Sequence, residues 1–108
     1  ECQEIFVHDR IYSYIAALVQ ATRNHELIAL GVSPRGTLAL TKMAQAGAFL
    51  SGRSHVLPED VQSVFADVCV HRLILNSKAR ISHVSPLSLL EEILKTTPAP
   101  SVRKKTSL

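Results

Sequence analysis

The sequence contains no tryptophan, one methionine and two cysteines, and none of its apolar runs is long. A membrane-spanning helix needs roughly 20 consecutive apolar residues, so we expect no membrane segment and no membrane partner. Cys2 and Cys69 are enough for one disulfide, but nothing in the sequence shows that the two thiols meet. We therefore expect reduced cysteines in a cytoplasmic protein.

Motifs that carry catalytic chemistry are also missing. No Gly-x-x-x-x-Gly-Lys-Ser/Thr segment is present to hold phosphates, and no hydrophobic strand ends in an Asp-Glu pair that could bind Mg²⁺. No Gly-x-Ser-x-Gly sequence marks a nucleophilic serine. The chain alone is therefore expected not to be an enzyme. We also expect no bound metal, because the histidines lack the i, i+4 spacing of a helical zinc site: His8, His25, His55, His71 and His83.

What the sequence does contain is the pattern of one small helical domain. Its 108 residues are 46% hydrophobic and 19% charged, which is enough for a single core. Apolar residues at three- and four-residue steps predict four helices, and hence an all-α fold. The predicted helices cover about 9–23, 34–51, 58–70 and 86–95. The second of these is apolar over the widest arc and is expected to be the most buried.

The connections between these helices carry further expectations. Residues 55–57 and 73–75 are short and apolar, and they are the candidates for a short two-stranded β-ribbon. Residues 27–31 are expected to form an apolar connector against the core, and residues 76–84 a polar loop.

The C-terminal end differs in composition from the rest of the chain. Pro98 and Pro100 cannot continue a helix, and Arg103-Lys104-Lys105 follows them. We therefore expect one domain over residues 1–97 and a flexible basic tail over residues 98–108. The formal net charge of +3 is modest, and three basic residues without an aromatic platform make nucleic-acid binding a weak expectation.

The clearest local signal is the helix start at Ser33. A serine caps a helix well, and Pro34 suits the first helical position because its missing N–H would be unpaired there. Arg35 then lies in the first turn, where backbone N–H groups and the helix dipole favour an anion such as phosphate. On chemistry alone, a solvated charge on a helix end is the commoner explanation of such an arginine.

Arg35 also belongs to a set of motifs that extends over most of residues 4–97. The motifs are Tyr14-Ile15, Ala21-Thr22-Arg23, Gly31-Val32-Ser33-Pro34-Arg35-Gly36, Gly52-Arg53, Pro58-Glu59-Asp60-Val61 and His71-Arg72-Leu73. In the order in which they occur, these motifs resemble the C-terminal lid domain of MoxR-type AAA+ ATPases. The resemblance implies a small helical domain beside a separate P-loop core, with nucleotide bound in the cleft between them.

In that family the arginine of the Ser-Pro-Arg motif is the sensor 2 residue, which reaches toward the nucleotide phosphates. The resemblance therefore implies that Arg35 binds nucleotide, supported by the turn of Gly31, Ser33 and Pro34. Leu57 stands where the family commonly has serine or threonine. The helix that follows should therefore lose a side-chain cap, at a cost of roughly 1 kcal/mol.

Four other residues are candidates for contacts between domains or between subunits: Arg23, Arg53, His71 and Arg72. For Arg23 and Arg53, a structural or interdomain ion pair is favoured over a phosphate contact, with a contact to an adjacent subunit as the alternative for Arg53. His71 and Arg72 are expected at the end of the third helix, where the helix dipole favours cations.

The resemblance also implies the activity of the parent protein. ATP and Mg²⁺ are its cofactors, and no ligand is expected to bind tightly to this chain alone. Its partners are the P-loop core of the same polypeptide and further copies in a homo-oligomeric ring. Closure of the lid over ATP would couple hydrolysis to the remodelling or maturation of a client protein. One alternative stays open, a free-standing helical interaction module that binds nucleic acid through its basic tail.

Overall fold

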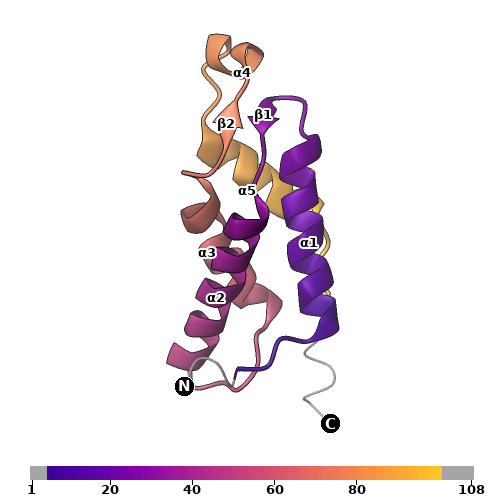
Figure 1. Cartoon of the computed structure of the whole chain (residues 1–108), viewed down its shortest axis with the longest axis vertical. Helices are drawn as coiled ribbons and strands as arrows, with labels where there is room; N and C mark the ends of the chain where they lie inside the picture. The colour runs from indigo at the N-terminus through magenta and orange to yellow at the C-terminus, as the bar shows by residue number, and fades with distance from the viewer. Residues whose placement is uncertain (1–4, 101–108) are drawn as a thin grey trace.

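The computed structural model describes residues 5–100, whose helices pack into an elongated bundle with a small ribbon toward one end (Figure 1). Within these residues the chain forms five helices and two strands, which confirms a mostly helical fold with a short two-stranded ribbon. Cys2 and residues 101–108 of the expected tail lie outside the described part. The elements are α1 (Asp9–Asn24), β1 (Ile28–Leu30), α2 (Pro34–Leu50), α3 (Pro58–Cys69), β2 (Ile74–Leu75), α4 (Ser77–Ile81) and α5 (Pro86–Thr96).

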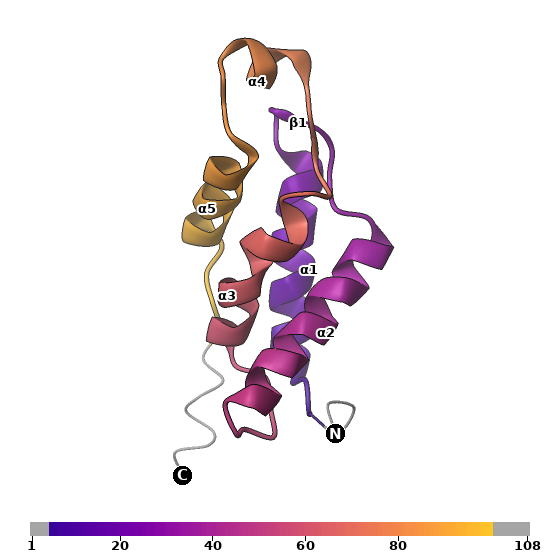
Figure 2. The same ribbon diagram turned by 90° about the vertical axis from the view of Figure 1, so that its left-hand side faces the viewer.

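The core lies between α1, α2, α3 and α5. The most extensive contact joins α2 to α3, and α1 and α5 pack against α3 and against each other. Figure 2 shows α3 between α5 and α2, with α1 behind them. Burying a large apolar side chain stabilises a fold by roughly 1.5–3 kcal/mol, and many such contributions together offset the entropy that the chain loses on folding. The largest fully buried side chains come from all four helices and include Ile11, Ile15, Leu18, Leu40, Phe65 and Leu90.

The ribbon forms, but between different segments from those expected. β2 pairs antiparallel with β1, with Ile28 opposite Leu75 and Leu30 opposite Ile74. The prediction of a strand at 73–75 is thus confirmed in position, whereas its pairing with residues 55–57 is wrong. His55 instead forms an isolated parallel bridge with Phe6. The partner of β2 is thus β1, which lies in the segment 27–31 that was expected to be a connector. The backbone N–H of Asn76 donates to the carbonyl oxygen of Leu27 at 3.1 Å and adds to this pairing.

Residues 76–84 are not a plain polar loop, so that prediction is wrong. The side-chain oxygen of Asn76 accepts a hydrogen bond of 3.0 Å from the N–H of Ala79 and caps the short helix α4. The side-chain amide of Asn76 donates to the carbonyl oxygen of Glu26 at 2.6 Å. One asparagine therefore both starts α4 and ties it to the segment before β1.

The expectation that the second helix is the most buried is also wrong. The residues that α2 buries are mainly small, and four of its large apolar side chains remain exposed. Leu38 is 56% exposed and Leu50 is 83% exposed. Small side chains let α2 approach its neighbours closely, so its bulky residues project from the other side. The buried set is Gly36, Leu40, Thr41, Ala44 and Ala48, and the exposed set is Leu38, Met43, Phe49 and Leu50.

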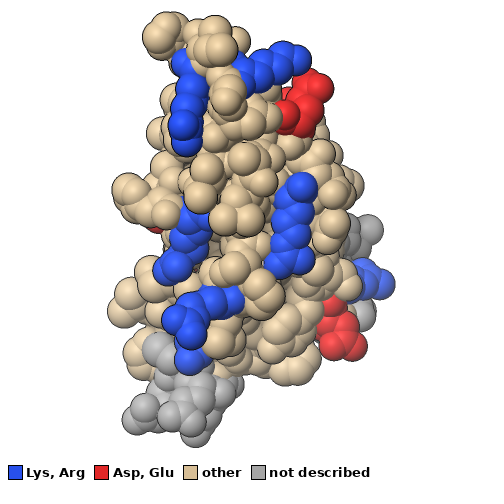
Figure 3. Space-filling view, turned by 45° about the horizontal axis from the view of Figure 1, so that its top comes forward, with Lys and Arg blue, Asp and Glu red and all other residues tan. Residues whose placement is uncertain are grey.

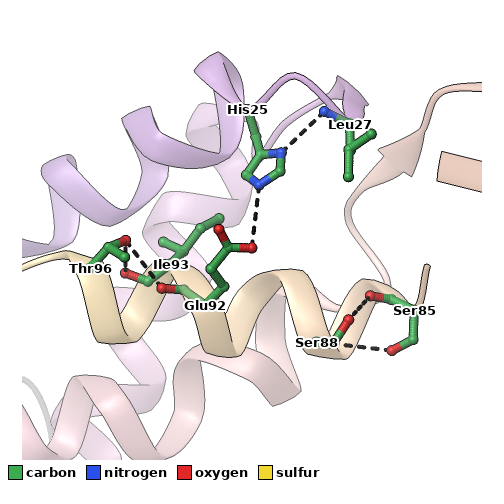
Figure 4. A network of polar contacts seen from close by, with 7 residues as sticks. All are labelled: His25, Leu27, Ser85, Ser88, Glu92, Ile93 and Thr96. Atoms are coloured by element: carbon green, nitrogen blue, oxygen red, sulfur yellow. Dashed lines mark hydrogen bonds and ion pairs between the residues drawn. The ribbon is translucent and has the colours of Figure 1, made fainter. Parts of the chain in front are cut away.

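The C-terminal end of α1 is linked to α5 through His25 (Figure 4). The His25 Nδ1 atom accepts a hydrogen bond of 3.1 Å from the N–H of Leu27, and its Nε2 atom lies 3.8 Å from Glu92 Oε1. The same view shows Ser85 at the start of α5, where its Oγ accepts from the N–H of Ser88 at 3.2 Å. Among the helices of residues 5–100, none is long and apolar enough to cross a membrane.

Candidate functional site

The turn that leads into α2 is held in place by the last turn of α1. The hydroxyl of Thr22 donates to the carbonyl oxygen of Val19 at 2.6 Å and accepts from the N–H of Val32 at 3.0 Å. Both Thr22 and Val32 are fully buried. A buried backbone N–H that lost its partner would cost about 1–3 kcal/mol, so Thr22 fixes the position of Val32 strongly.

Gly31 allows this close approach. A Cβ atom at Gly31 would lie 2.8 Å from both the Cα and the backbone N of Arg23. Because these are backbone atoms, no side-chain movement could relieve the clash. The Nε–H of Arg23 donates to the carbonyl oxygen of Val32 at 2.9 Å, which makes a second link between α1 and the turn.

Ser33, Pro34 and Arg35 then form the start of α2 as the sequence predicts. Ser33 is the N-cap, and its Oγ accepts a hydrogen bond of 3.2 Å from the N–H of Gly36. Pro34 is the first helical residue. Arg35 is exposed on the first turn, and no hydrogen bond or ion pair joins it to another described residue. Its guanidinium is therefore presented to solvent beside the positive end of the helix dipole.

Arg72 comes from the turn after α3 and lies against the same first turn of α2. Its Cδ is 3.1 Å from the position of a Cβ at Gly36. The absence of a side chain at Gly36 therefore leaves room for the aliphatic part of Arg72. His71 and Arg72 are both exposed, one turn or less beyond the end of α3, as expected.

These segments surround a cleft of about 780 Å³. Two arginines and a histidine line it, and no carboxylate does. Figure 3 shows the same imbalance more broadly, with lysine and arginine side chains spread over one face and acidic side chains toward its margins. Such a surface attracts anions. The lining residues are Arg23, Ala29, Leu30, Gly31, Val32, Ser33, Pro34, His71 and Arg72.

The thiol of Cys69, close enough to Arg72 to feel its charge, is fully buried. Burial raises the pKa of Cys69 to about 11, although the nearby charge of Arg72 acts in the opposite direction. A thiol with so high a pKa stays protonated at neutral pH and is a poor nucleophile or metal ligand. Among the described residues, no group of three or more His, Cys, Asp or Glu could hold a metal ion.

Arg53 is not part of the cleft. It lies beyond the other end of α2, where its guanidinium pairs with the carboxylate of Asp60 on α3. The Asp60 side chain is only 8% exposed, and its other oxygen accepts the N–H of Leu57 at 2.7 Å. Leu57 supplies no cap from its own side chain, as predicted, but Asp60 satisfies the N-cap N–H from within the helix. The N–H groups of the first turn of α3 still receive no side-chain acceptor from Leu57.

The structure thus brings Arg23, Gly31, Ser33, Pro34, His71 and Arg72 around one cleft, with Arg35 on the adjoining turn and Arg53 elsewhere. Sequence reasoning did not identify Thr22 and Asp60 as the residues that position these groups. Thr22 stands in the apolar stripe of α1, and a hydroxyl at such a position is a usable signal that a backbone group needs a partner there.

Comparisons with known proteins agree on one family. A model of the AAA lid domain matches residues 20–93. The uncharacterized protein YeaC of Bacillus subtilis is 38% identical over 95% of this chain, and the chaperone MoxR1 of Mycobacterium tuberculosis is 35% identical over 90% of it. The aligned regions are 32% and 28% of these relatives, so the chain spans about a third of their length.

A solved structure gives the same result in three dimensions. The crystal structure of a candidate ATPase from Cytophaga hutchinsonii superposes with a TM-score of 0.87 at 31% identity. The match covers 93% of this chain and 33% of that one. The turn at Ser33 to Arg35 and the helices around it are therefore those of a known domain: the chain belongs to the AAA lid domain family and is a lid of the MoxR type.

Proposed function

We propose that this domain closes over ATP held by a separate P-loop core of the same polypeptide, and that Arg35 binds the phosphates as the sensor 2 residue. The placement of Arg35 supports this most. Its side chain is exposed on the first turn of α2, without an internal partner among the described residues, and the backbone N–H groups of that turn favour the same anion. The guanidinium can hold a phosphate through two parallel hydrogen bonds.

The outer face of α2 is suited to contact the core. Arg35, Lys42 and Phe49 are spaced by seven residues and therefore lie on one side of the helix, and all three are exposed. The helix contains no acidic residue. An exposed face that is apolar and positively charged fits a surface that is covered by another domain and approaches a phosphate.

The chain's own contribution to the cycle is a change of position. Arg35 gains a contact when the terminal phosphate is present and loses it when that phosphate leaves. A ligand shifts a conformational equilibrium only through such a difference in binding. The hydrogen bonds of Thr22 and Arg23 with the backbone of Val32 join the turn that carries Arg35 to α1, so the lid should move as one body. In a ring of such subunits this movement would act on client proteins, in line with the chaperone name of one relative.

Replacement of Arg35 in the full-length parent tests the proposal. A hydrogen bond to a charged group contributes about 1.5–3 kcal/mol, so Arg35→Ala should weaken ATP binding or slow turnover by roughly 10- to 100-fold. Arg35→Lys should recover part of the loss, since it keeps the charge but not the planar fork. ATPase rates and titration with a fluorescent ATP analogue measure both effects.

Arg80→Ala is the matched control. Arg80 is an exposed arginine on α4, which lies at the ribbon end of the molecule and does not line the cleft (Figure 1). The Arg80→Ala variant should have the same ATP affinity and turnover as the wild-type parent. Equal activity of the Arg35→Ala variant and the wild-type parent would remove Arg35 from the mechanism.

The alternative of a nucleic-acid-binding module depended on Arg103, Lys104 and Lys105, which lie outside the described residues. The surface charge visible on the described part is equally compatible with phosphates of any kind. Titration of the 108-residue chain with duplex and single-stranded DNA at two salt concentrations separates the two proposals. Salt-dependent binding that is lost on truncation after Pro100 would favour the nucleic-acid module.

A further inference from the structure

Arg72, which lines the cleft from the turn after α3, is held in position by its own contacts. Its backbone N–H donates to the carbonyl oxygen of Cys69 at 2.9 Å, which fixes the turn that follows α3. Its aliphatic stem lies on Gly36, where any larger residue would meet the Cδ atom at 3.1 Å. Gly36 directly follows Arg35, so Arg72 lies against the turn of α2 that carries Arg35.

No ion pair among the described residues explains this placement, although Asp67 lines a neighbouring hollow together with His71 and Arg72. Arg72 is exposed, and no ion pair or side-chain hydrogen bond joins it to another residue of the described range 5–100. The cleft it lines contains no Asp or Glu, and a second cation, Arg23, is fixed there through its bond to Val32. Like charges that line a cleft without a paired carboxylate repel one another in the free domain. Binding of a multiply charged anion would relieve that repulsion.

We infer that Arg72 is a second phosphate-binding residue, which holds the polyphosphate of the same nucleotide as Arg35. This inference rests on the proposed function. Arg23 acts as a positioning residue, since its Nε–H is already used to hold Val32 in the turn. Two guanidinium groups match a triphosphate, which carries several negative charges, better than the single carboxylate of a neighbouring subunit.

The inference is tested in the full-length parent with Arg72→Gln, which keeps much of the aliphatic stem against Gly36 and removes the charge. ATP affinity should fall by about 10-fold, the loss expected for one charged hydrogen bond. Arg72→Lys should lie between this variant and wild type. Titrations with ATP, ADP and inorganic triphosphate, alone and combined with Arg35→Ala, show whether the two arginines act on one ligand.

If they do, the double variant should differ from the product of the single effects, because groups that share a ligand are coupled. Unchanged affinity in Arg72→Gln together with impaired Arg35→Ala would overturn the inference and leave the proposed function standing. If neither Arg72→Gln nor Arg35→Ala changed ATP affinity, both the inference and the proposed function would be overturned. The inference also fails if Arg72→Gln disrupts assembly, measured by light scattering without nucleotide, while ATP affinity per subunit is unchanged. In that case Arg72 pairs with a neighbouring subunit.

Discussion

Just beyond the C-terminal end of α2, Arg53 is paired inside the domain with Asp60, whereas at its N-terminal end Arg35 and Arg72 extend into solvent. The sequence around both regions is similar in kind: a glycine, a basic residue and a proline within a few positions. What differs is the presence of a carboxylate. Asp60 reaches back from α3 to neutralise Arg53, and no acidic residue lines the cleft at the other end.

The difference separates two uses of arginine in one small domain. Arg53 closes the loop between α2 and α3 and contributes to folding. The cations at the cleft weaken the fold slightly by their mutual repulsion and are available to a ligand. Variants of the first group should therefore change the free energy of unfolding, and variants of the second should change binding.

The largest expected effect is on the paired end. Asp60→Ala removes the partner of Arg53 and the acceptor for the N–H of Leu57. Removing one partner of a buried ion pair leaves the other charge uncompensated, and Arg53 is partly exposed, so we expect a loss of about 3 kcal/mol. Urea unfolding of the 108-residue chain, followed by circular dichroism, measures it.

Asp67→Ala is the control on the same helix. Asp67 is exposed on α3, and substitutions of this kind usually change stability by less than about 0.5 kcal/mol. Similar unfolding midpoints for the Asp60 and Asp67 variants would mean that the Arg53–Asp60 pair does not stabilise the fold, and the contrast between the two ends would be lost.

The second effect contrasts two glycines of α2. A Cβ at Gly36 would lie 2.7 Å from Cγ1 of the fully buried Val32, whereas the nearest atom at Gly47 is 3.9 Å away. Gly36→Ala should therefore destabilise the domain by about 1–2 kcal/mol through overpacking. Gly47→Ala should stabilise it by about 0.5–1 kcal/mol, since alanine is the better helix former. Urea unfolding curves of the two variants measure both changes in stability. If Gly36→Ala stabilised the domain as Gly47→Ala should, Gly36 would not be closely packed against Val32.

Local signals in the sequence were sufficient for the four longer helices and for the start of α2, but not for the short helix α4. Ser33 and Pro34 are adjacent, and the capping hydrogen bond of Ser33 extends only to Gly36, so the geometry of this helix start depends little on the rest of the chain. The pairing of the ribbon could not be predicted in the same way. Segments 28–30 and 55–57 are both short and apolar, and only the tertiary contact of Asn76 with residues 26 and 27 selects the first.

The exposure of α2 was mispredicted for a related reason. A helix that is apolar over a wide arc is equally consistent with burial in the core and with a face covered by another domain. Leu50 and Leu38 contribute the same apolarity to the pattern as Leu40, although only Leu40 is buried. The sequence of one lid cannot separate these cases, because it contains only one side of any such contact.

The last effect is absent at neutral pH and concerns the buried thiol of Cys69. The pKa of Cys69 in the fold is about 11, against a usual value of 9.0, because burial disfavours the thiolate. The unfolded chain therefore loses this proton first as the pH rises. The stabilisation is complete below pH 9 and is lost as the pH rises toward 11. Between pH 9 and 11 the free energy of unfolding should fall more steeply with pH for wild type than for Cys69→Ala. The packing that Cys69→Ala loses lowers stability equally at every pH, so it does not change this pH dependence.

Arg72 should modify this slope, since its charge lowers the pKa of Cys69. Arg72→Gln should raise that pKa further, so the loss of stability would extend to higher pH. Arg53→Gln, at the other end of α2, should leave the pH dependence of the Cys69 contribution unchanged while lowering stability at every pH. If the two arginine variants shifted the alkaline slope alike, the charge of Arg72 would not act on Cys69 more strongly than that of Arg53.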